Sequence, residues 1–181
     1  MLSSTSIAEL AENLRRLQSG TPDAEIVRWL RAASPDAAKI PVPIACDPKR
    51  SYSRTLLYKS AAFEILVIHW RPGCVSAIHD HGGAHCWLAV SDGTMHVDNY
   101  VRKDSGKEEG YAALRLEGRE HLTAGGIDYR NDDVHLHRCA TSAAPATTLH
   151  VYAKPISRFN AFDEKTYAIS EIVSAYDADL T

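Results

Sequence analysis

The sequence lacks both the cysteine content of a disulfide-rich protein and any run of basic residues, and each absence excludes a class of protein. Its four cysteines stand at positions 46, 74, 86 and 139, with neither the C-x-x-C spacing nor the density of a disulfide scaffold, so we expect reduced thiols. The net charge is −3, and no stretch is rich in lysine or arginine. Electrostatic attraction to nucleic acid or to an anionic membrane is therefore not expected.

Long apolar runs are also missing. No stretch approaches the roughly 20 apolar residues of a transmembrane helix, and the first residues lack the basic start and apolar core of a signal peptide. We therefore expect a cytoplasmic protein with no membrane partner. A length of 181 residues is typical of one domain and is sufficient for a full core. We expect a single domain over residues 1–181 that forms a monomer or a small homo-oligomer.

Residues 1–38 are expected to form a helical segment packed on the rest of the domain. Ser6 and Glu9 have the spacing of a capping box, apolar residues follow at helical spacing, and Gly20 ends the pattern. A second helix is expected to begin at Thr21-Pro22 and to stop at Ser34-Pro35. We assign no chemistry to either helix.

Residues 40–165 read as a strand-rich region, which makes the fold mainly β. Short β-rich runs are separated by turn residues such as Asp92-Gly93 and Gly125-Gly126. Many short strands at near-regular spacing are typical of a jelly-roll barrel, whose interior can hold a ligand. The expected strands are Arg54–Tyr58, Phe63–Trp70, His85–Val90, Thr94–Val101, Tyr111–Leu116, Glu120–Thr123, Leu136–Ala140 and Thr147–Tyr152.

A histidine pair within this region is a candidate metal site. Residues two apart on a strand share a face, so His79 and His81 can bind one ion. Together with Gly73, their spacing is similar to the first motif of the cupin barrels, in which a glutamate ligand follows. Cys86 stands where that glutamate would be.

A second half of the site is expected further along the chain. Gly126 and His137 have the spacing of the second cupin motif. His135 would share a strand face with His137, so alternation alone does not choose between them, and the motif spacing favours His137. Asp80 is expected to face away from the ligands on its strand.

Three imidazoles without a carboxylate leave the charge of a divalent ion uncompensated and favour an anionic ligand. The commoner non-heme iron site supplies two histidines and a carboxylate. A three-histidine iron suits a substrate that brings its own thiolate, whereas zinc would accept three histidines and a water, as in hydrolytic sites. The ligands alone leave both metals open.

Several segments resemble the cysteine dioxygenases in order and spacing. The resemblance implies a thiol dioxygenase of cysteine catabolism and of taurine and sulfinate metabolism. This enzyme would add both atoms of O2 to the sulfur of L-cysteine, to give cysteine sulfinic acid. It also implies Fe(II) held by His79, His81 and His137. The segments are Tyr52-Ser53-Arg54, Ile78–His81 running into His85-Cys86, Leu136-His137-Arg138, Leu149–Tyr152 and Ala161-Phe162-Asp163.

The same resemblance implies a substrate-binding pair and a covalent pair. Arg54 matches the arginine that binds the substrate carboxylate, a task for which a planar guanidinium fork is suited. Tyr52 would share its strand face and matches an active-site tyrosine. Cys86 and Tyr152 match the cysteine and tyrosine that form a thioether in animal members, which makes both of them catalytic candidates.

His150 completes the implied catalytic set. With Tyr152 and Thr148 it resembles a serine–histidine–tyrosine relay in which threonine replaces serine. The family commonly has two prolines after this strand, the first in a cis peptide. This chain has Ala153-Lys154-Pro155 instead, where a cis bond before Lys154 would be costly.

Three alternatives stay open at this point. Arg158 could provide a second carboxylate anchor, so a mercapto-acid such as 3-mercaptopropionate or mercaptosuccinate is an alternative substrate. A zinc-dependent isomerase or hydrolase would need a carboxylate base near the ligands, and neither Asp80 nor Glu64 is expected there. The third alternative is a cupin that binds a metal or a small ligand without catalysis.

Overall fold

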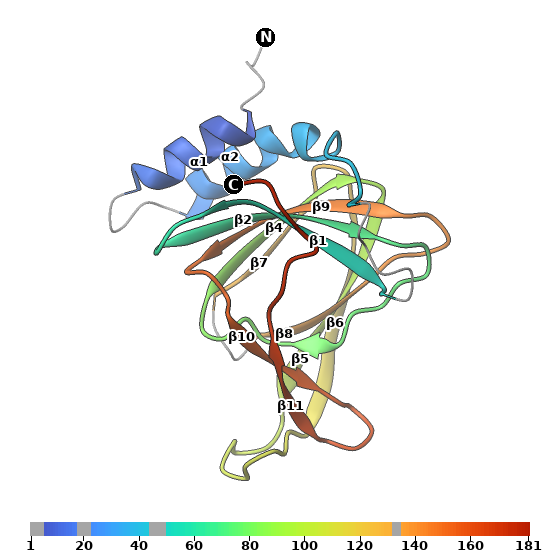
Figure 1. The fold of residues 1–181 in the computed structure, drawn as a ribbon. Coiled ribbons are helices and arrows are strands. Elements are labelled where there is room, and N and C mark those ends of the chain that lie inside the picture. The colour runs from blue at the N-terminus through green and yellow to red at the C-terminus, as the bar shows by residue number, and fades with distance from the viewer. Residues whose placement is uncertain (1–5, 18–22, 44–49, 132–134) are drawn as a thin grey trace.

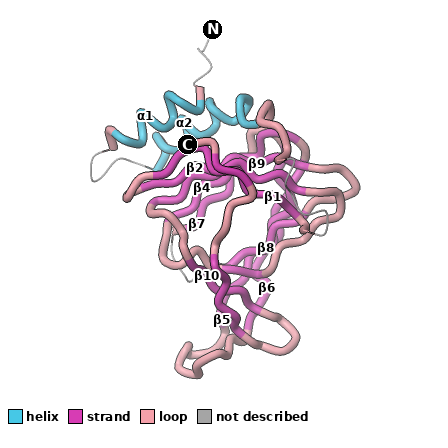
Figure 2. Tube along the Cα trace, in the orientation of Figure 1, coloured by secondary structure: helices cyan, strands magenta, loops and turns pink. Residues whose placement is uncertain are grey.

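Two β-sheets face one another, and two N-terminal helices cover the outer side of one sheet (Figure 1). The computed structural model describes residues 6–17, 23–43, 50–131 and 135–181. Figure 2 shows how strands dominate these residues and how the helices stay together on one side. The expected fold, a mainly β cupin jelly roll with two N-terminal helices, is confirmed.

The first helix agrees closely with the sequence prediction. Helix α1 spans Ile7–Arg15, and Ser6 is its N-cap. The backbone N–H of Glu9 donates to Ser6 Oγ at 3.1 Å, and the Ser6 N–H donates to the Glu9 carboxylate at 2.7 Å, which completes the expected capping box. The expected stop at Gly20 and start at Thr21-Pro22 lie outside the described residues.

The second helix runs past its expected end. Helix α2 spans Asp23–Ala37, with Pro35 inside its last turn, so the stop predicted at Ser34-Pro35 is wrong. Proline lacks the N–H for one helical hydrogen bond, and only two helical residues follow Pro35. The buried Ala33 and Ala37 favour continuation of the helix, and Ser34 Oγ donates to the Val90 carbonyl at 3.3 Å.

The strands form two six-stranded sheets. One has the order β12-β1-β2-β9-β4-β7 and the other the order β11-β10-β3-β8-β5-β6. The strands are β1 (Tyr52–Lys59), β2 (Phe63–Trp70), β3 (Ile78–His79), β4 (His85–Asp92), β5 (Thr94–Arg102), β6 (Leu114–Thr123), β7 (Ile127–Arg130), β8 (Leu136–Ala140), β9 (Ala146–Ala153), β10 (Arg158–Phe162), β11 (Ile169–Val173) and β12 (Ala178–Asp179).

One expected pair of strands is a single strand. Strand β6 begins at Leu114 and joins the end of the run expected at Tyr111–Leu116 to the run expected at Glu120–Thr123, while Tyr111 makes only an isolated bridge to Ala168. It pairs along β5 with a register shift between Asn99 and Tyr100. Most of β6 is exposed at the edge of its sheet. The alternation of apolar and polar residues that marks a half-buried strand is therefore weak there.

The sheet beneath the helices is buried on both faces. Ile65 and Val67 of β2 pack with Leu10 and Leu30 of the helices, whereas Leu66, between them in sequence, belongs to the core between the sheets. Successive side chains of a strand point to opposite faces, which explains why the centre of β2 is apolar at every position from Ile65 to Ile68. Because the helices cover the outer face of this sheet, its inner face is left to form the core and the cavity between the two sheets.

The strands continue beyond residue 165, where the barrel was expected to end. Strand β11 pairs with β10, and β12 pairs in parallel with β1 through Thr55 and Leu56. These pairs attach the C-terminal residues to both sheets. One domain over residues 1–181 stays a prediction.

The peptide bonds, the cysteines and the helices bear on three expectations from the sequence. Among the described residues no peptide bond is cis, and Lys154 adopts a positive φ of 25°. Cys74, Cys86 and Cys139 are buried free thiols, while Cys46 lies outside the described residues. Neither described helix combines the length and the apolarity that crossing a bilayer requires.

Candidate functional site

Three histidines converge between the two sheets. His79 ends β3, His81 follows it, and His137 lies on β8 directly opposite His79 in the strand register. One ring nitrogen from each lies within 4.8 Å of the other two. His135, the alternative by strand alternation, is exposed and hydrogen-bonded to Asn131. The structure thus brings together the three histidines that the motif spacing selected.

The ring nitrogens of this cluster have the hydrogen bonding and protonation that metal binding requires. His79 Nδ1 donates to the Ala77 carbonyl at 3.0 Å, which leaves Nε2 with its lone pair. His81 Nδ1 is buried and has no hydrogen-bond partner among the described residues. Burial lowers the pKa of all three imidazoles, and for His81 and His137 the neighbouring imidazoles lower it further. Neutral rings with free lone pairs are the form that binds a metal, so these residues fit one.

His137 is oriented by a buried ion pair that the sequence analysis missed. Its Nδ1 donates to Asp128 Oδ2 at 2.9 Å. Arg130 Nη2 donates to Asp128 Oδ1 at 2.5 Å and to Asn99 Oδ1 at 2.5 Å. Burial raises the pKa of Asp128, and the Arg130 charge opposes that rise. A carboxylate bonded to the outer nitrogen of a ligand histidine fixes its tautomer and ring orientation.

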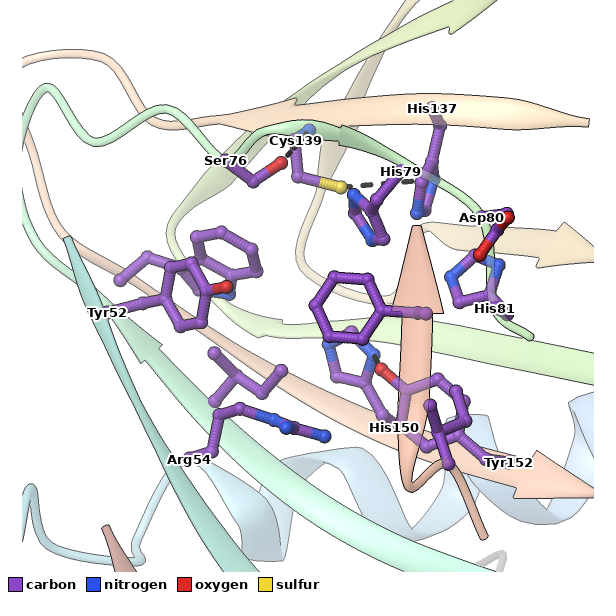
Figure 3. Close-up of a pocket in the computed structure, with 14 residues that line it drawn as sticks. Tyr52, Arg54, Ser76, His79, Asp80, His81, His137, Cys139, His150 and Tyr152 are labelled. Carbon is purple, nitrogen blue, oxygen red and sulfur yellow. Dashed lines mark hydrogen bonds between the residues drawn. The ribbon is translucent and has the colours of Figure 1, made fainter. Parts of the chain in front are cut away.

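No carboxylate belongs to the cluster itself. Within the part of the chain that the structure describes, the group of close metal-binding atoms contains histidines only. Asp80, between two of them in sequence, accepts hydrogen bonds from the Asn160 backbone and side chain, both at 2.8 Å. Its carboxylate therefore holds β10 and is not part of the cluster. Asp80 nevertheless lines the cavity beside the histidines (Figure 3), so the expectation that it faces away from the ligands is not confirmed.

A small cavity adjoins the histidines (Figure 3). About 50 Å³ of it is accessible to water-sized molecules, which is room for a few waters or one small molecule. Tyr52 and Trp70 line one part with their rings 4.8 Å apart, and Phe159 packs on His79 with ring centres 5.7 Å apart. The walls therefore combine aromatic surface with a few polar groups, as small-molecule sites do.

Arg54 lines this cavity from β1. It is buried, and Figure 3 shows its guanidinium pointing toward His150 and Tyr152. Its Nη1 donates to Ser174 Oγ at 2.6 Å and to the Ala175 carbonyl at 3.1 Å. Among the residues that the structure describes, no carboxylate is bonded to this side chain, so its charge is available to an anionic ligand in the cavity.

Cys86 and Tyr152 lie directly opposite each other on β4 and β9. Burial raises the pKa of the Cys86 thiol and of the Tyr152 hydroxyl well above their ordinary values, and a hydrogen bond to Tyr152 partly opposes the rise at Cys86. Both groups are therefore protonated in the folded protein. Tyr152 lines the cavity, with its ring centre 5.9 Å from that of His81.

A chain of hydrogen bonds leads to Tyr152 from the core. Trp70 Nε1 donates to Thr148 Oγ1 at 2.8 Å, Thr148 Oγ1 lies 2.8 Å from His150 Nε2, and His150 Nδ1 lies 3.0 Å from the Tyr152 hydroxyl. Burial first, and then the Arg54 charge, lower the pKa of His150 to about 3. His150 is therefore neutral near pH 7. Trp70 is the member of this chain that the sequence analysis did not include.

Arg158 lies elsewhere. It forms an exposed ion pair with Glu171 on the neighbouring strand and does not line the cavity. The structure thus gives no support to a second carboxylate anchor at this position. The overlooked Asp128 and Arg130 lie two apart on β7, and the sequence signal for them was only that opposite charges two apart share one face of a short strand.

Comparisons with known proteins agree with this site. The sequence profile of the family "Cysteine dioxygenase type I" matches residues 1–165. Cysteine dioxygenase type 1 of Bos taurus is 26% identical over 181 residues, which covers 97% of this chain and 88% of that protein. The Homo sapiens protein of the same name is 30% identical over 118 residues, which covers 64% of this chain and 57% of that protein.

A solved structure supports the fold alone. A protein of Bacillus halodurans has a TM-score of 0.50 and 13% sequence identity, and the match covers 72% of this chain and 81% of that one. The family match covers most of the chain, and its range spans the positions of the three histidines, Arg54 and Tyr152. The chain is therefore an enzyme of the cysteine dioxygenase type I family.

Proposed function

We propose that this enzyme oxidises the thiol of L-cysteine to a sulfinate, with both oxygen atoms supplied by O2. The observation that carries the proposal is a cluster of three histidines without a carboxylate, next to a small cavity that Arg54 lines. The substrate then provides the negative charge that the ligand set lacks, through its thiolate. Membership of a dioxygenase family favours this function over a cupin that only binds a ligand.

His79, His81 and His137 would hold a ferrous ion. When bound, such an ion supplies open coordination positions for the substrate sulfur and for O2, and it carries the electrons of the oxidation. The protein's own contribution is the orientation of the rings, which Ala77 fixes for His79 and Asp128 fixes for His137.

Arg54 would bind the substrate carboxylate. Its side chain is buried, so the charge is shielded from water. An ion pair is stronger in such surroundings than at the surface, because the dielectric constant is lower. Two parallel hydrogen bonds from a guanidinium would fix the direction of the carboxylate and so hold the sulfur beside the histidines. The small volume of the cavity suits a substrate of the size of an amino acid.

The relay would set the direction of the Tyr152 hydroxyl. The indole of Trp70 can only donate, so the Thr148 oxygen accepts and its own hydrogen is free to donate to His150 Nε2. His150 Nδ1 then carries the ring proton and donates to the Tyr152 oxygen. The Tyr152 hydrogen is left to donate into the cavity, to substrate or to oxygen.

Cys86 and Tyr152 would form the thioether of the family's animal members. The new bond joins Sγ to the ring carbon beside the hydroxyl, and the thiol and that carbon each lose one hydrogen. This two-electron oxidation needs an acceptor, which O2 at the loaded site provides. Their opposed positions on adjacent strands support the proposal.

The test is oxygen uptake by the protein loaded with Fe(II). We expect L-cysteine to be consumed more efficiently than 3-mercaptopropionate, and the product to be heavier than cysteine by the mass of one O2. With 18O2, both labelled atoms should appear in the product. A higher kcat/KM for 3-mercaptopropionate or mercaptosuccinate would replace cysteine by a mercapto-acid, and no uptake with any of these thiols would refute the function.

The Arg54→Ala variant checks the role of the arginine in the same assay. It should lose most of its efficiency with L-cysteine while its efficiency with cysteamine, which has no carboxylate, changes little. Equal losses for both thiols would contradict the role proposed for Arg54.

A cytoplasmic location and a monomeric or small oligomeric state stay predictions.

A further inference from the structure

The C-terminal residues hold the guanidinium of Arg54. We call residues 174–177 the C-terminal clasp. Arg54 Nη1 donates to Ser174 Oγ at 2.6 Å and to the Ala175 carbonyl at 3.1 Å. The backbone of Arg54 is bound as well, because its N–H donates to Asp177 Oδ2 at 2.8 Å and its carbonyl accepts from the Asp177 N–H at 2.8 Å.

The clasp is itself anchored to the barrel. The Tyr176 hydroxyl donates to Glu64 Oε2 at 2.5 Å, and Arg54 lies over the Tyr176 ring with its guanidinium carbon 5.5 Å from the ring centre. Glu64 is fully buried on β2, and its other oxygen accepts from the Ile156 N–H at 3.2 Å. The hydroxyl of Ser174 is therefore placed by a connected set of contacts.

The clasp leaves one edge of the guanidinium for a ligand. An arginine side chain has five N–H donors, and the two on Nη1 are used by the clasp. Within the described part of the chain, Nε and Nη2 make no hydrogen bond. These two nitrogens carry parallel N–H groups, which is the geometry of a two-bond carboxylate fork. Figure 3 shows the guanidinium directed into the cavity.

We propose that Ser174 and the Ala175 carbonyl, by holding Nη1, present the Nε and Nη2 edge of Arg54 to the substrate carboxylate. Ser174 is thus a positioning residue for carboxylate-bearing thiols. That the ligand is a thiol is taken from the proposed function. The clasp lies beyond residue 165, where the family profile ends, so it is a feature of this chain rather than of the matched segment.

Because the clasp holds the Arg54 side chain, less conformational entropy is lost when a ligand binds. A free arginine loses considerable rotamer freedom when it binds a ligand. A guanidinium that is already held loses less, and the difference appears as affinity. Without the Ser174 hydroxyl, the guanidinium would be free to turn and offer a different edge, which weakens the fork without removing the charge.

The test is anaerobic calorimetry of the Fe(II)-loaded protein with L-cysteine and with cysteamine, which lacks the carboxylate. We expect the wild type to bind L-cysteine about 10- to 100-fold more tightly than cysteamine. Ser174→Ala should weaken L-cysteine binding by about 3- to 10-fold and leave cysteamine binding unchanged. Ser174→Thr, which keeps the hydroxyl, should restore the affinity for L-cysteine.

Ser170→Ala is the matched control, because this exposed serine of β11 does not line the cavity. It should leave both affinities unchanged. The inference is overturned if Ser174→Ala keeps the affinity for L-cysteine, if it weakens both ligands equally, or if the wild type does not prefer L-cysteine. Oxygen uptake by the wild type is measured separately. Normal binding without uptake would refute the proposed function and leave this inference standing.

Discussion

The ion pair of Asp128 and Arg130 offers two separable measurements. Their side chains are 4% and 10% exposed, and Asp128 also accepts the Nδ1 proton of His137 at 2.9 Å. Asp128→Leu leaves the Arg130 charge buried without its partner, a change that typically costs about 3–5 kcal/mol. Asn99 still accepts from Arg130, so we expect the lower end, about 3 kcal/mol. For a chain of this size, that lowers the melting temperature by roughly 6–12 °C.

The double variant Asp128→Leu with Arg130→Met distinguishes charge from orientation. It removes both charges, so most of the lost stability should return. His137 still lacks its acceptor in both variants, so both should bind Co(II) about 10- to 100-fold more weakly than the wild type. The assays are thermal unfolding of the metal-free protein and competition for Co(II) with a chelator. If the double variant bound Co(II) as tightly as the wild type, Asp128 would not orient His137.

Three further predictions address the strand that carries Tyr152. If Cys86 and Tyr152 form a thioether, mass spectrometry of the intact wild-type protein after aerobic turnover should show a species lighter by the mass of one H2. The Cys86→Ala variant should not show this species, and its appearance there would mean that any cross-link involves other residues. Thr148→Val removes a hydroxyl bonded to Trp70 and His150, so unfolding by urea should show a loss of about 1–3 kcal/mol, whereas Thr148→Ser should lose less. The pKa of His150 is about 3 in the folded protein and about 6.5 when unfolded, so the unfolded chain binds the extra proton between these values. The free energy of unfolding should therefore fall as the pH drops from about 6.5 toward about 3. In His150→Gln the free energy of unfolding should depend less steeply on pH in this range. The same pH dependence in both proteins would contradict a buried neutral His150.

The histidine cluster could be predicted because its geometry depends on local rules. Strand alternation places His79 and His81 on one face, and motif spacing separates His137 from His135. The structure brings these three rings together and leaves His135 on the surface. The capping box of Ser6 was predictable for the same reason, since it involves residues three apart.

Residues that depend on distant pairing could not be predicted. Asp128 lies on a strand of four residues whose partner is β4, and nothing in its sequence neighbours indicates contact with His137. Ser174 meets Arg54 only through the return of the C-terminal residues to β1. Helix α2 passes Pro35 because its alanines pack on the sheet, which local propensity does not register.

The parallel pairing of β1 with β12 has a consequence for the order in which the site is assembled. Asp177, which binds the backbone of Arg54, is synthesised 123 residues later. The ribosome makes the chain from its N-terminus, so all three histidines are synthesised before the clasp is made. We expect a released chain that ends before Ser174 to bind metal yet discriminate poorly between thiols with and without a carboxylate.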